Sequence, residues 1–160
     1  MCGELTDEEG VDFLRAVVTR VSSASVEIDG VTAGRIDKGF LVLLGIKTGD
    51  TDDDAIKLAG KVCNLRVFAD SEGKMNLDLE AASGSILVIS QFTLFADCKS
   101  RRPGFTAAAR PETAIPLYEL FINECRNTGF TVETGEFGAM MDVSSVNAGP
   151  VTILLDTETM

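Results

Sequence analysis

The chain has 160 residues, of which 45% are hydrophobic and 24% are charged, a composition typical of one globular domain. It contains no histidine, which excludes Ser-His-Asp and Cys-His nucleophiles, histidine proton shuttles and histidine-bound metals. Its net charge of −11 argues against a general nucleic-acid-binding protein, because contacts to phosphates need a basic surface.

The chain begins with an acidic segment, residues 1–13, which contains no basic residue. We expect a loosely ordered extension there, followed by a single domain over residues 14–160. The segment lacks the basic and apolar stretches of a secretory signal, and no apolar run approaches the ~20 residues that span a bilayer. The sequence therefore predicts a soluble cytoplasmic protein with no membrane partner.

Short strands are predicted from residue 16 onward. Apolar runs place them at 16–21, 25–28, 31–36 and 40–46, with a hairpin turn at Asp29-Gly30. A helix follows, and Thr51 or Asp52 can cap it. Its apolar face consists of residues spaced three and four apart: Ala55, Leu58, Ala59, Val62 and Cys63.

The second half of the chain mixes short strands with one more helix. Strands are predicted at 67–68 and 85–90, the latter continuing into 91–95, and Pro103-Gly104 indicates a surface loop over 99–110. A second helix is predicted from Pro111 to about Thr128, stopped by Gly129. Its inner face consists of Ile115, Tyr118, Ile122 and Cys125. The last strands are expected at 131–134, 141–146 and 150–155. Together, roughly ten short strands and two main helices predict an α+β fold with a curved, barrel-like mixed β-sheet.

The four cysteines are far apart and form no CxxC pair: Cys2, Cys63, Cys98 and Cys125. Without histidine beside them, they are typical of free thiols in a cytosolic protein rather than of a zinc or redox site. We therefore expect no metal and no cofactor. Chemistry must come from carboxylates, hydroxyls, lysines, backbone dipoles or the substrate itself.

Polar residues follow directly on the apolar run 86–89, in the segment Ser90-Gln91-Phe92-Thr93-Leu94. One interpretation is a strand that leaves the core with a surface-facing edge. The other is a pocket at a strand end. There Ser90, Gln91, Thr93 and local backbone N–H groups would bind a carbonyl and stabilise the oxyanion formed when an ester is attacked.

A second unusual segment is Asn147-Ala148-Gly149-Pro150-Val151-Thr152. Gly-Pro before a strand is usually a simple turn, but an X-Pro bond can also be cis. A cis bond presents neighbouring carbonyl oxygens in a fixed arrangement. Two such acceptors can bind an ammonium group while leaving no room beside it.

Both segments closely resemble the two signature motifs of the D-aminoacyl-tRNA deacylase family. Three further stretches are similar to the family: residues 15–26 (RAVVTRVSSASV), 73–77 (GKMNL) and 133–139 (ETGEFGA). The resemblance covers residues 15–156 in the family's order and spacing, so it is highly specific. One departure is Ala148, where many relatives carry an acidic or polar residue.

The resemblance implies a homodimeric, metal-independent enzyme that hydrolyses the ester between a D-amino acid and the 3′ end of a tRNA. Gly149-Pro150 is then cis and reaches into the partner subunit's pocket. Its carbonyls bind the substrate's α-amino group, and its bulk excludes an L side chain but admits glycine. Met141 and Asn147 are implied to shape the pocket near this pair, and Arg20 to hold its loop.

By the same resemblance, Ser90, Gln91, Phe92 and Thr93 surround the scissile ester and the terminal adenosine. Catalysis is implied to depend on the 2′-hydroxyl of that adenosine. Thr93 as a nucleophile is the rival role, although no base within sequence reach activates it. Hydrolysis by an oriented substrate and an oxyanion hole suits a chain without histidine.

Two other classes stay open on the residues alone: a non-catalytic nucleic-acid-binding module on the same fold, and a small-molecule amidase or esterase. The acidic net charge and the intact motifs weigh against the first, and the lack of a nucleophile with a base weighs against the second. Positive charge is concentrated in one loop, at Lys99, Arg101 and Arg102. We expect this loop to contact tRNA phosphates, the alternative being an ordinary solvated loop.

Leu14 stands where relatives usually have their first methionine, and leucine codons can serve as bacterial starts. We therefore expect the natural protein to begin at residue 14. The alternative is a genuine acidic arm that limits non-specific RNA binding by charge repulsion. Mass spectrometry of the protein from its own cells decides this, because an intact peptide covering residues 2–12 would contradict a start at residue 14.

Overall fold

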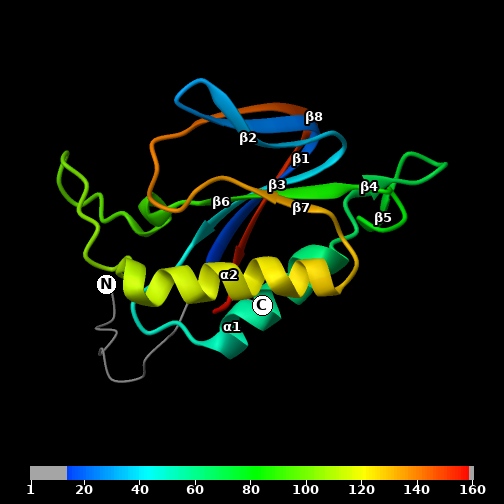
Figure 1. Cartoon of the computed structure of the whole chain (residues 1–160). Helices are drawn as coiled ribbons and strands as arrows, with labels where there is room; N and C mark the ends of the chain where they lie inside the picture. The colour runs from blue at the N-terminus through cyan, green and yellow to red at the C-terminus, as the bar shows by residue number, and fades with distance from the viewer. Residues whose placement is uncertain (1–13, 159–160) are drawn as a thin grey trace.

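The computed structural model describes residues 14–158. The acidic segment 1–13, expected to be a loosely ordered extension, lies outside the described residues. Figure 1 shows a curved sheet with two helices packed together on one of its faces. The elements are β1 (Arg15–Ile28), β2 (Val31–Ile36), β3 (Gly39–Gly45), α1 (Asp52–Asn64), β4 (Phe68–Ala69), β5 (Met75–Leu77), β6 (Ser85–Ser90), η1 (Phe92–Phe95), α2 (Pro111–Asn127), β7 (Val132–Thr134) and β8 (Asp142–Asp156).

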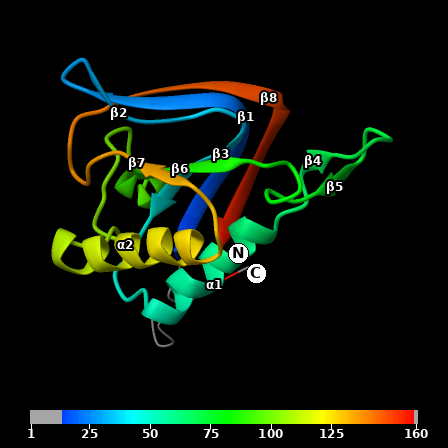
Figure 2. The same ribbon diagram turned by 45° about the vertical axis from the view of Figure 1, so that its right-hand side comes forward.

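β1 organises the sheet, because three strands pair with it. β2, β3 and β8 run antiparallel to β1, whereas β6 runs parallel to both β3 and β7. β1 is one strand where two were predicted. It stays paired with β8 through two register shifts around Val21, and both strands bend (Figure 2). This bend curls the sheet toward a barrel, as predicted.

Two other expectations were wrong, and one strand was not predicted. The strands expected at 141–146 and 150–155 are one strand, β8, because pairing with β1 resumes after Gly149-Pro150. Residues 92–95 form the short 3-10 helix η1 instead of extending β6. β5 was not predicted, because its three residues are too few to show a strand period, and it forms a hairpin with β4.

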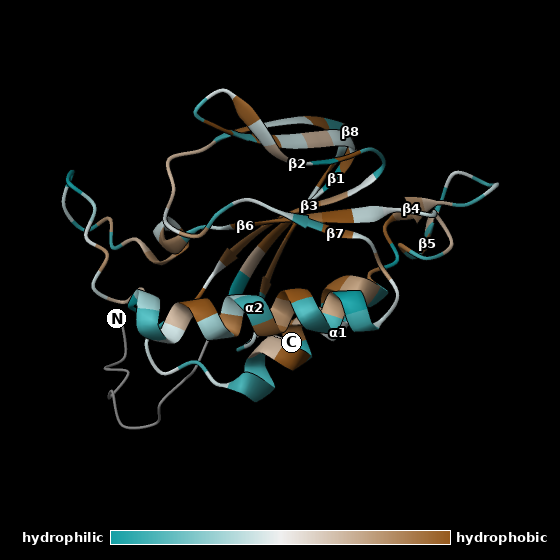
Figure 3. Ribbon diagram, in the orientation of Figure 1, coloured by the Kyte–Doolittle hydropathy of each residue, from teal (hydrophilic) through white to brown (hydrophobic). Residues whose placement is uncertain are grey.

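Two hydrophobic cores lie on the two faces of β3 and β6. The larger core, between sheet and helices, contains the fully buried Phe40 and Phe121. The smaller core fills the curl of β1 and β2 and contains Leu41 and Leu87. Successive strand residues therefore point into different cores, which explains the continuous apolar run at 40–46. In Figure 3 the strands are brown where the helices cover them.

The helix ends follow from local chemistry. Thr51 Oγ1 accepts the Asp54 N–H at 3.3 Å and the Asp54 carboxylate accepts the Thr51 N–H at 3.0 Å, a capping box for α1. Pro111 opens α2, where its missing N–H costs nothing. The Tyr118 hydroxyl of α2 donates to the Val88 carbonyl at 3.2 Å, and burial raises the pKa of Tyr118 to about 12. This bond fixes α2 against the strand that leads to η1.

Gly60 offers a test of how α1 is stabilised. It lies exposed within α1, and a Cβ built on it meets no atom within 4 Å. Gly60→Ala is expected to stabilise the protein by roughly 0.5–1 kcal/mol, because alanine loses less backbone entropy in a helix. Differential scanning calorimetry should show a Tm about 1–4 °C higher. A lower Tm would contradict this account of α1.

Among residues 14–158, the cysteines Cys63, Cys98 and Cys125 are free thiols, as predicted. Cys2 lies outside the described residues. No helix in this part of the chain is long and apolar enough to cross a membrane.

Candidate active site

A hollow of about 300 Å³ opens where the parallel strands β3 and β6 end. Ser90, Gln91 and Phe92 line it, directly after the buried part of β6. The rest of the wall comes from the ends of β3 and β6, from Ile46, Ala109 and Ala114, and from the segment 137–143. The carboxyl ends of parallel strands are a common place for ligand sites, because the loops that follow can vary without disturbing the sheet.

Met141, a predicted pocket residue, lines the same hollow. Its sulfur occupies the space beside Gly135, since a Cβ on Gly135 would lie 2.5 Å from Met141 Sδ. Phe137 and Met140 also line the hollow and were not predicted, although Met140 is 91% exposed. Both residues lie between β7 and β8, in a stretch whose sequence shows neither a strand nor a helix period, so no pattern pointed to them.

η1 begins at Phe92, which lines this hollow. The Gln91 N–H donates to Leu44 O at 2.8 Å, and the Leu94 N–H closes the first turn onto Gln91 O at 3.2 Å. A 3-10 helix provides no internal acceptor for its first N–H groups, here those of Phe92 and Thr93. Two adjacent donors of this kind can bind a carbonyl oxygen and the oxyanion derived from it.

Thr93 is exposed and does not line the hollow through its own surface. The Gln91 side-chain Nε2 donates to Thr93 Oγ1 at 2.5 Å. A side-chain amide that donates to a hydroxyl cannot remove its proton, so this contact orients Thr93 without making it a nucleophile.

Gly149 and Pro150 lie at the bend of β8. Thr19 pairs with Thr152 and Val21 pairs with Asn147, so residues 148–151 stand opposite Arg20 alone. This bulge carries Gly149-Pro150 out of the strand, where the missing N–H of proline breaks no ladder bond. The Gly149–Pro150 peptide bond is cis, as the resemblance implied.

Arg20 holds this bulge from the opposite strand. Its Nε donates to Ala148 O at 2.7 Å, and its Nη1 donates to Val67 O at 2.5 Å. Arg20 therefore ties the bulge to the start of the β4–β5 hairpin. Gly149 has a φ of +127°, and a Cβ there would collide with Arg20 Nη2. The close approach and the backbone angle both require glycine at this position.

The two predicted motifs do not meet within one chain. Gly149 lines a separate hollow with Arg20, Lys38 and Phe68, and this hollow shares no residue with the one beside η1. Asn147 is exposed on β8.

The basic loop predicted at 99–110 is exposed over residues 99–106 and projects beside η1 (Figure 1). Asp97 and Gly104 pair at its base through two backbone hydrogen bonds of 2.7 and 2.9 Å. Lys99 lines a hollow of about 580 Å³ together with Arg15 and Lys47. Lys47 was not predicted, because it stands alone in the sequence.

Residues 14–158 hold no group of three or more cysteine, aspartate, glutamate or histidine side chains placed to bind a metal ion. The donors at the hollow beside η1 are amide, hydroxyl and backbone N–H groups, and they suit a carbonyl rather than a cation. Such donors can bind an ester carbonyl and stabilise an oxyanion, which is what a hydrolase without histidine requires.

Comparison with known proteins identifies the family. A sequence profile described as D-Tyr-tRNA(Tyr) deacylase matches residues 17–156, and the chain belongs to this family. It is 53% identical over 146 residues to a D-aminoacyl-tRNA deacylase of Thermosipho africanus (strain TCF52B), covering 91% of this chain and 98% of that one. It is 54% identical over 145 residues to a D-aminoacyl-tRNA deacylase of Thermus aquaticus, covering 90% and 95%.

Two solved structures are similar. One, described as c-Myc DNA Unwinding Element Binding Protein, has a TM-score of 0.83 and 39% identity, covering 88% of this chain and 97% of that one. The other, a probable eukaryotic D-amino acid tRNA deacylase, has a TM-score of 0.77 over 90% of this chain and 99% of that one. At 18% identity this second likeness shows the fold alone.

Proposed function

We propose that this chain hydrolyses the ester bond of D-aminoacyl-tRNA, and of glycine mischarged on tRNA, to free tRNA and amino acid. One observation carries the proposal. A hollow of about 300 Å³ is lined by Ser90, Gln91 and Phe92, the last of which begins η1. The names of relatives more than 50% identical to the chain support it.

In the proposed reaction, the N–H groups of Phe92 and Thr93 hold the ester carbonyl and stabilise the oxyanion. The 2′-hydroxyl of the terminal adenosine assists the attack of water, and Thr93, oriented by the Gln91 amide, does not act as the nucleophile. Removing one oxyanion donor typically costs about 10²–10³ in rate, so positioned donors can supply much of the catalysis.

The proposed enzyme is a homodimer in which Gly149-Pro150 of one subunit enters the hollow of the other. Two features support this. The motifs lie in separate hollows of one chain, and β8 pairs only with β1 among the described strands while its side chains from Asp142 to Asn147 are exposed. Val146 and Leu154 on β8 are 56% and 62% exposed, an apolar surface that a second copy would cover. Arg20, Asn147 and Met141 would then frame the chirality filter.

Hydrolysis of D-tyrosyl-tRNA and L-tyrosyl-tRNA, each with and without a chelator, tests the proposal. We expect selective hydrolysis of the D form that persists with the chelator. Equal turnover of both forms would overturn the chirality filter. Loss of activity with the chelator would overturn a metal-independent reaction. Failure to hydrolyse either substrate would overturn the proposed activity.

The basic loop is proposed to contact the acceptor end of the tRNA. Replacing Lys99, Arg101 and Arg102 with glutamine should raise KM and flatten its salt dependence, each lost phosphate contact lowering the logarithmic slope by about 0.7–0.9. Lys57→Gln, on the outer side of α1, is the matched control. An unchanged slope would assign the three residues to a solvated loop.

A non-catalytic nucleic-acid-binding role is the second candidate. The observation that favours it is the description of a structure 39% identical to this chain as a DNA-unwinding-element-binding protein. Tight binding of nucleic acid without turnover of either aminoacyl-tRNA would support it. Turnover of small esters but not of aminoacyl-tRNA would support an esterase instead.

A further inference from the structure

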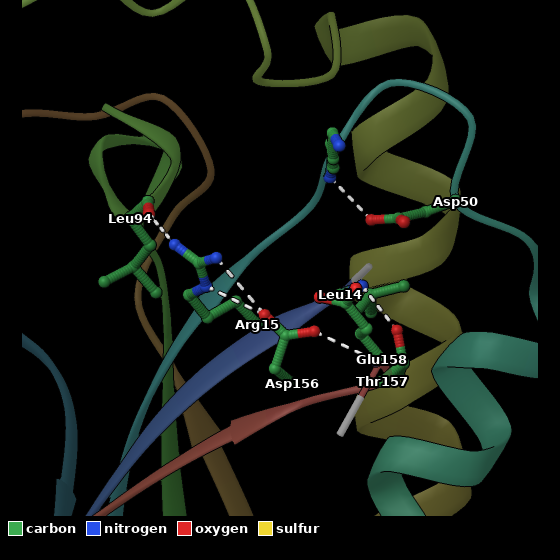
Figure 4. A network of polar contacts seen from close by, with 8 residues as sticks. Leu14, Arg15, Asp50, Leu94, Asp156, Thr157 and Glu158 are labelled. Atoms are coloured by element: carbon green, nitrogen blue, oxygen red, sulfur yellow. Dashed lines mark hydrogen bonds and ion pairs between the residues drawn. The ribbon is translucent and has the colours of Figure 1, made fainter. Parts of the chain in front are cut away.

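Arg15, at the start of β1, has contacts that lead directly to η1. Its Nη1 donates to the carbonyl of Leu94 at 2.8 Å, in the last turn of η1. Its Nε and Nη2 each lie 3.2 Å from Asp156 Oδ2, at the end of β8. All three guanidinium nitrogens are therefore engaged, and Figure 4 shows the guanidinium lying between the two acceptors.

The carboxylate that holds Arg15 is itself fixed. Asp156 is 9% exposed and stands opposite Arg15 in the pairing of β1 with β8. Its Oδ1 accepts the Glu158 N–H at 2.9 Å (Figure 4). An arginine held by a rigid carboxylate presents its remaining N–H groups in one direction, because the guanidinium is planar.

The N–H group of Arg15 that does not contact Asp156 points at the end of η1. The last carbonyls of a helix have no internal partner, and Arg15 supplies one for Leu94. The guanidinium carbon also lies 4.9 Å from the centre of the Phe95 ring, so Arg15 contacts two successive residues of η1. η1 has only four residues and cannot hold its own position through internal bonds.

We propose that Arg15 is a positioning residue for the active site: clamped by Asp156, it fixes η1 and thereby the N–H groups of Phe92 and Thr93 that bind the ester carbonyl. The inference rests on the proposed deacylase function. Arg15 lies at the far end of η1 from those donors and acts through the helix. A small displacement of η1 moves both donors away from the position of the oxyanion.

Arg15→Gln is expected to lower kcat for D-tyrosyl-tRNA about 10- to 100-fold, the effect of displacing positioned groups by up to ~1 Å. KM should change less than threefold. The kcat of Arg15→Lys should lie between that of Arg15→Gln and that of the unchanged protein. One ammonium group can bind Leu94 or Asp156 but not both. Arg15→Gln combined with Asp156→Asn should lower kcat no more than Arg15→Gln alone, since both changes break the same Arg15–Asp156 pair.

The matched control is Arg126→Gln. Arg126 Nη2 donates to the Val132 carbonyl at 3.0 Å, so the variant also removes a partly buried arginine–carbonyl bond, at the end of α2 remote from the hollow. It should lower Tm about as much as Arg15→Gln while leaving kcat unchanged. A kcat for Arg15→Gln within twofold of the unchanged protein, with the same loss of Tm, would reduce Arg15 to a structural role.

One further readout separates the possible failures. Amide hydrogen exchange at Leu94 and Ala96, whose N–H groups donate within η1, should become faster in Arg15→Gln and stay unchanged in Arg126→Gln. This readout needs no turnover. If the unchanged protein hydrolyses no D-aminoacyl-tRNA, the proposed function fails while the exchange still tests the clamp. Unchanged exchange, or a loss confined to KM with a flatter salt slope, would overturn the clamp.

Discussion

Gly149→Ala is expected to lower kcat/KM for D-tyrosyl-tRNA by at least about 100-fold. The backbone at Gly149 has a φ of +127°, which an L side chain rarely adopts, and the added Cβ would collide with Arg20 Nη2. Either the Arg20 guanidinium or the bulge must then move, and both movements disturb the 2.7 Å bond from Arg20 Nε to Ala148 O. Displacing a positioned group by ~1 Å can cost about 10² in rate. Single-turnover hydrolysis of D- and L-tyrosyl-tRNA measures the loss and any gain of L-specific hydrolysis.

Gly73→Ala is the control for this change. Gly73 also has a positive φ, +78°, but a Cβ there meets no atom within 4 Å, and it lies in the exposed turn between β4 and β5. This variant should lose a little stability and no activity. If Gly149→Ala behaves in the same way, the Gly149-Pro150 bulge has no part in substrate recognition.

The parts of the fold that the sequence predicts are those with a local cause. The α1 cap depends on Thr51 and Asp54, three residues apart, and the hairpin turn at Asp29-Gly30 depends on two adjacent residues with positive φ. The single strands β1 and β8 were missed because they continue only through pairing with each other. No local pattern marks residues 22–24, which join the two predicted strands into β1, as strand.

The site residues likewise divide into those with a local sequence signal and those placed by contacts between distant parts of the chain. Ser90, Gln91 and Phe92 are adjacent in sequence, so one motif locates them in one hollow. The contact of Arg15 with Leu94 joins residues 79 positions apart, and no spacing rule predicts it. The 3-10 turn of η1 was also missed, because a four-residue helix carries too few residues to show a period. The position of such a turn is determined by the residues that pack against it.

Gly45 is the residue of β3 that packs against η1. A Cβ on Gly45 would lie 3.0 Å from Leu94 Cβ, 3.0 Å from Phe95 Cε2 and 3.1 Å from the carbonyl oxygen of Gln91. Contacts this short cannot be relieved by one flexible side chain, because a backbone atom is among them. A side chain at Gly45 should therefore lift η1 from the sheet.

Gly45→Ala is expected to lower kcat about 10-fold and Gly45→Val about 100-fold, because a larger side chain displaces the donors of η1 further from the ester carbonyl. Steady-state kinetics on D-tyrosyl-tRNA measure both, with circular dichroism as the check on folding.

The matched control for Gly45→Ala is Gly84→Ala, which crowds the opposite end of the parallel strand pair. A Cβ on Gly84 would lie 2.5 Å from Leu79 Cδ1 and 3.3 Å from Lys38 O, far along β6 from Ser90. Both variants should lose stability, since each inserts a methyl group into a filled space. Only Gly45→Ala should lose kcat. Equal kcat in the two variants would mean that hydrolysis does not depend on where η1 sits, and the donors of its first turn would no longer account for catalysis.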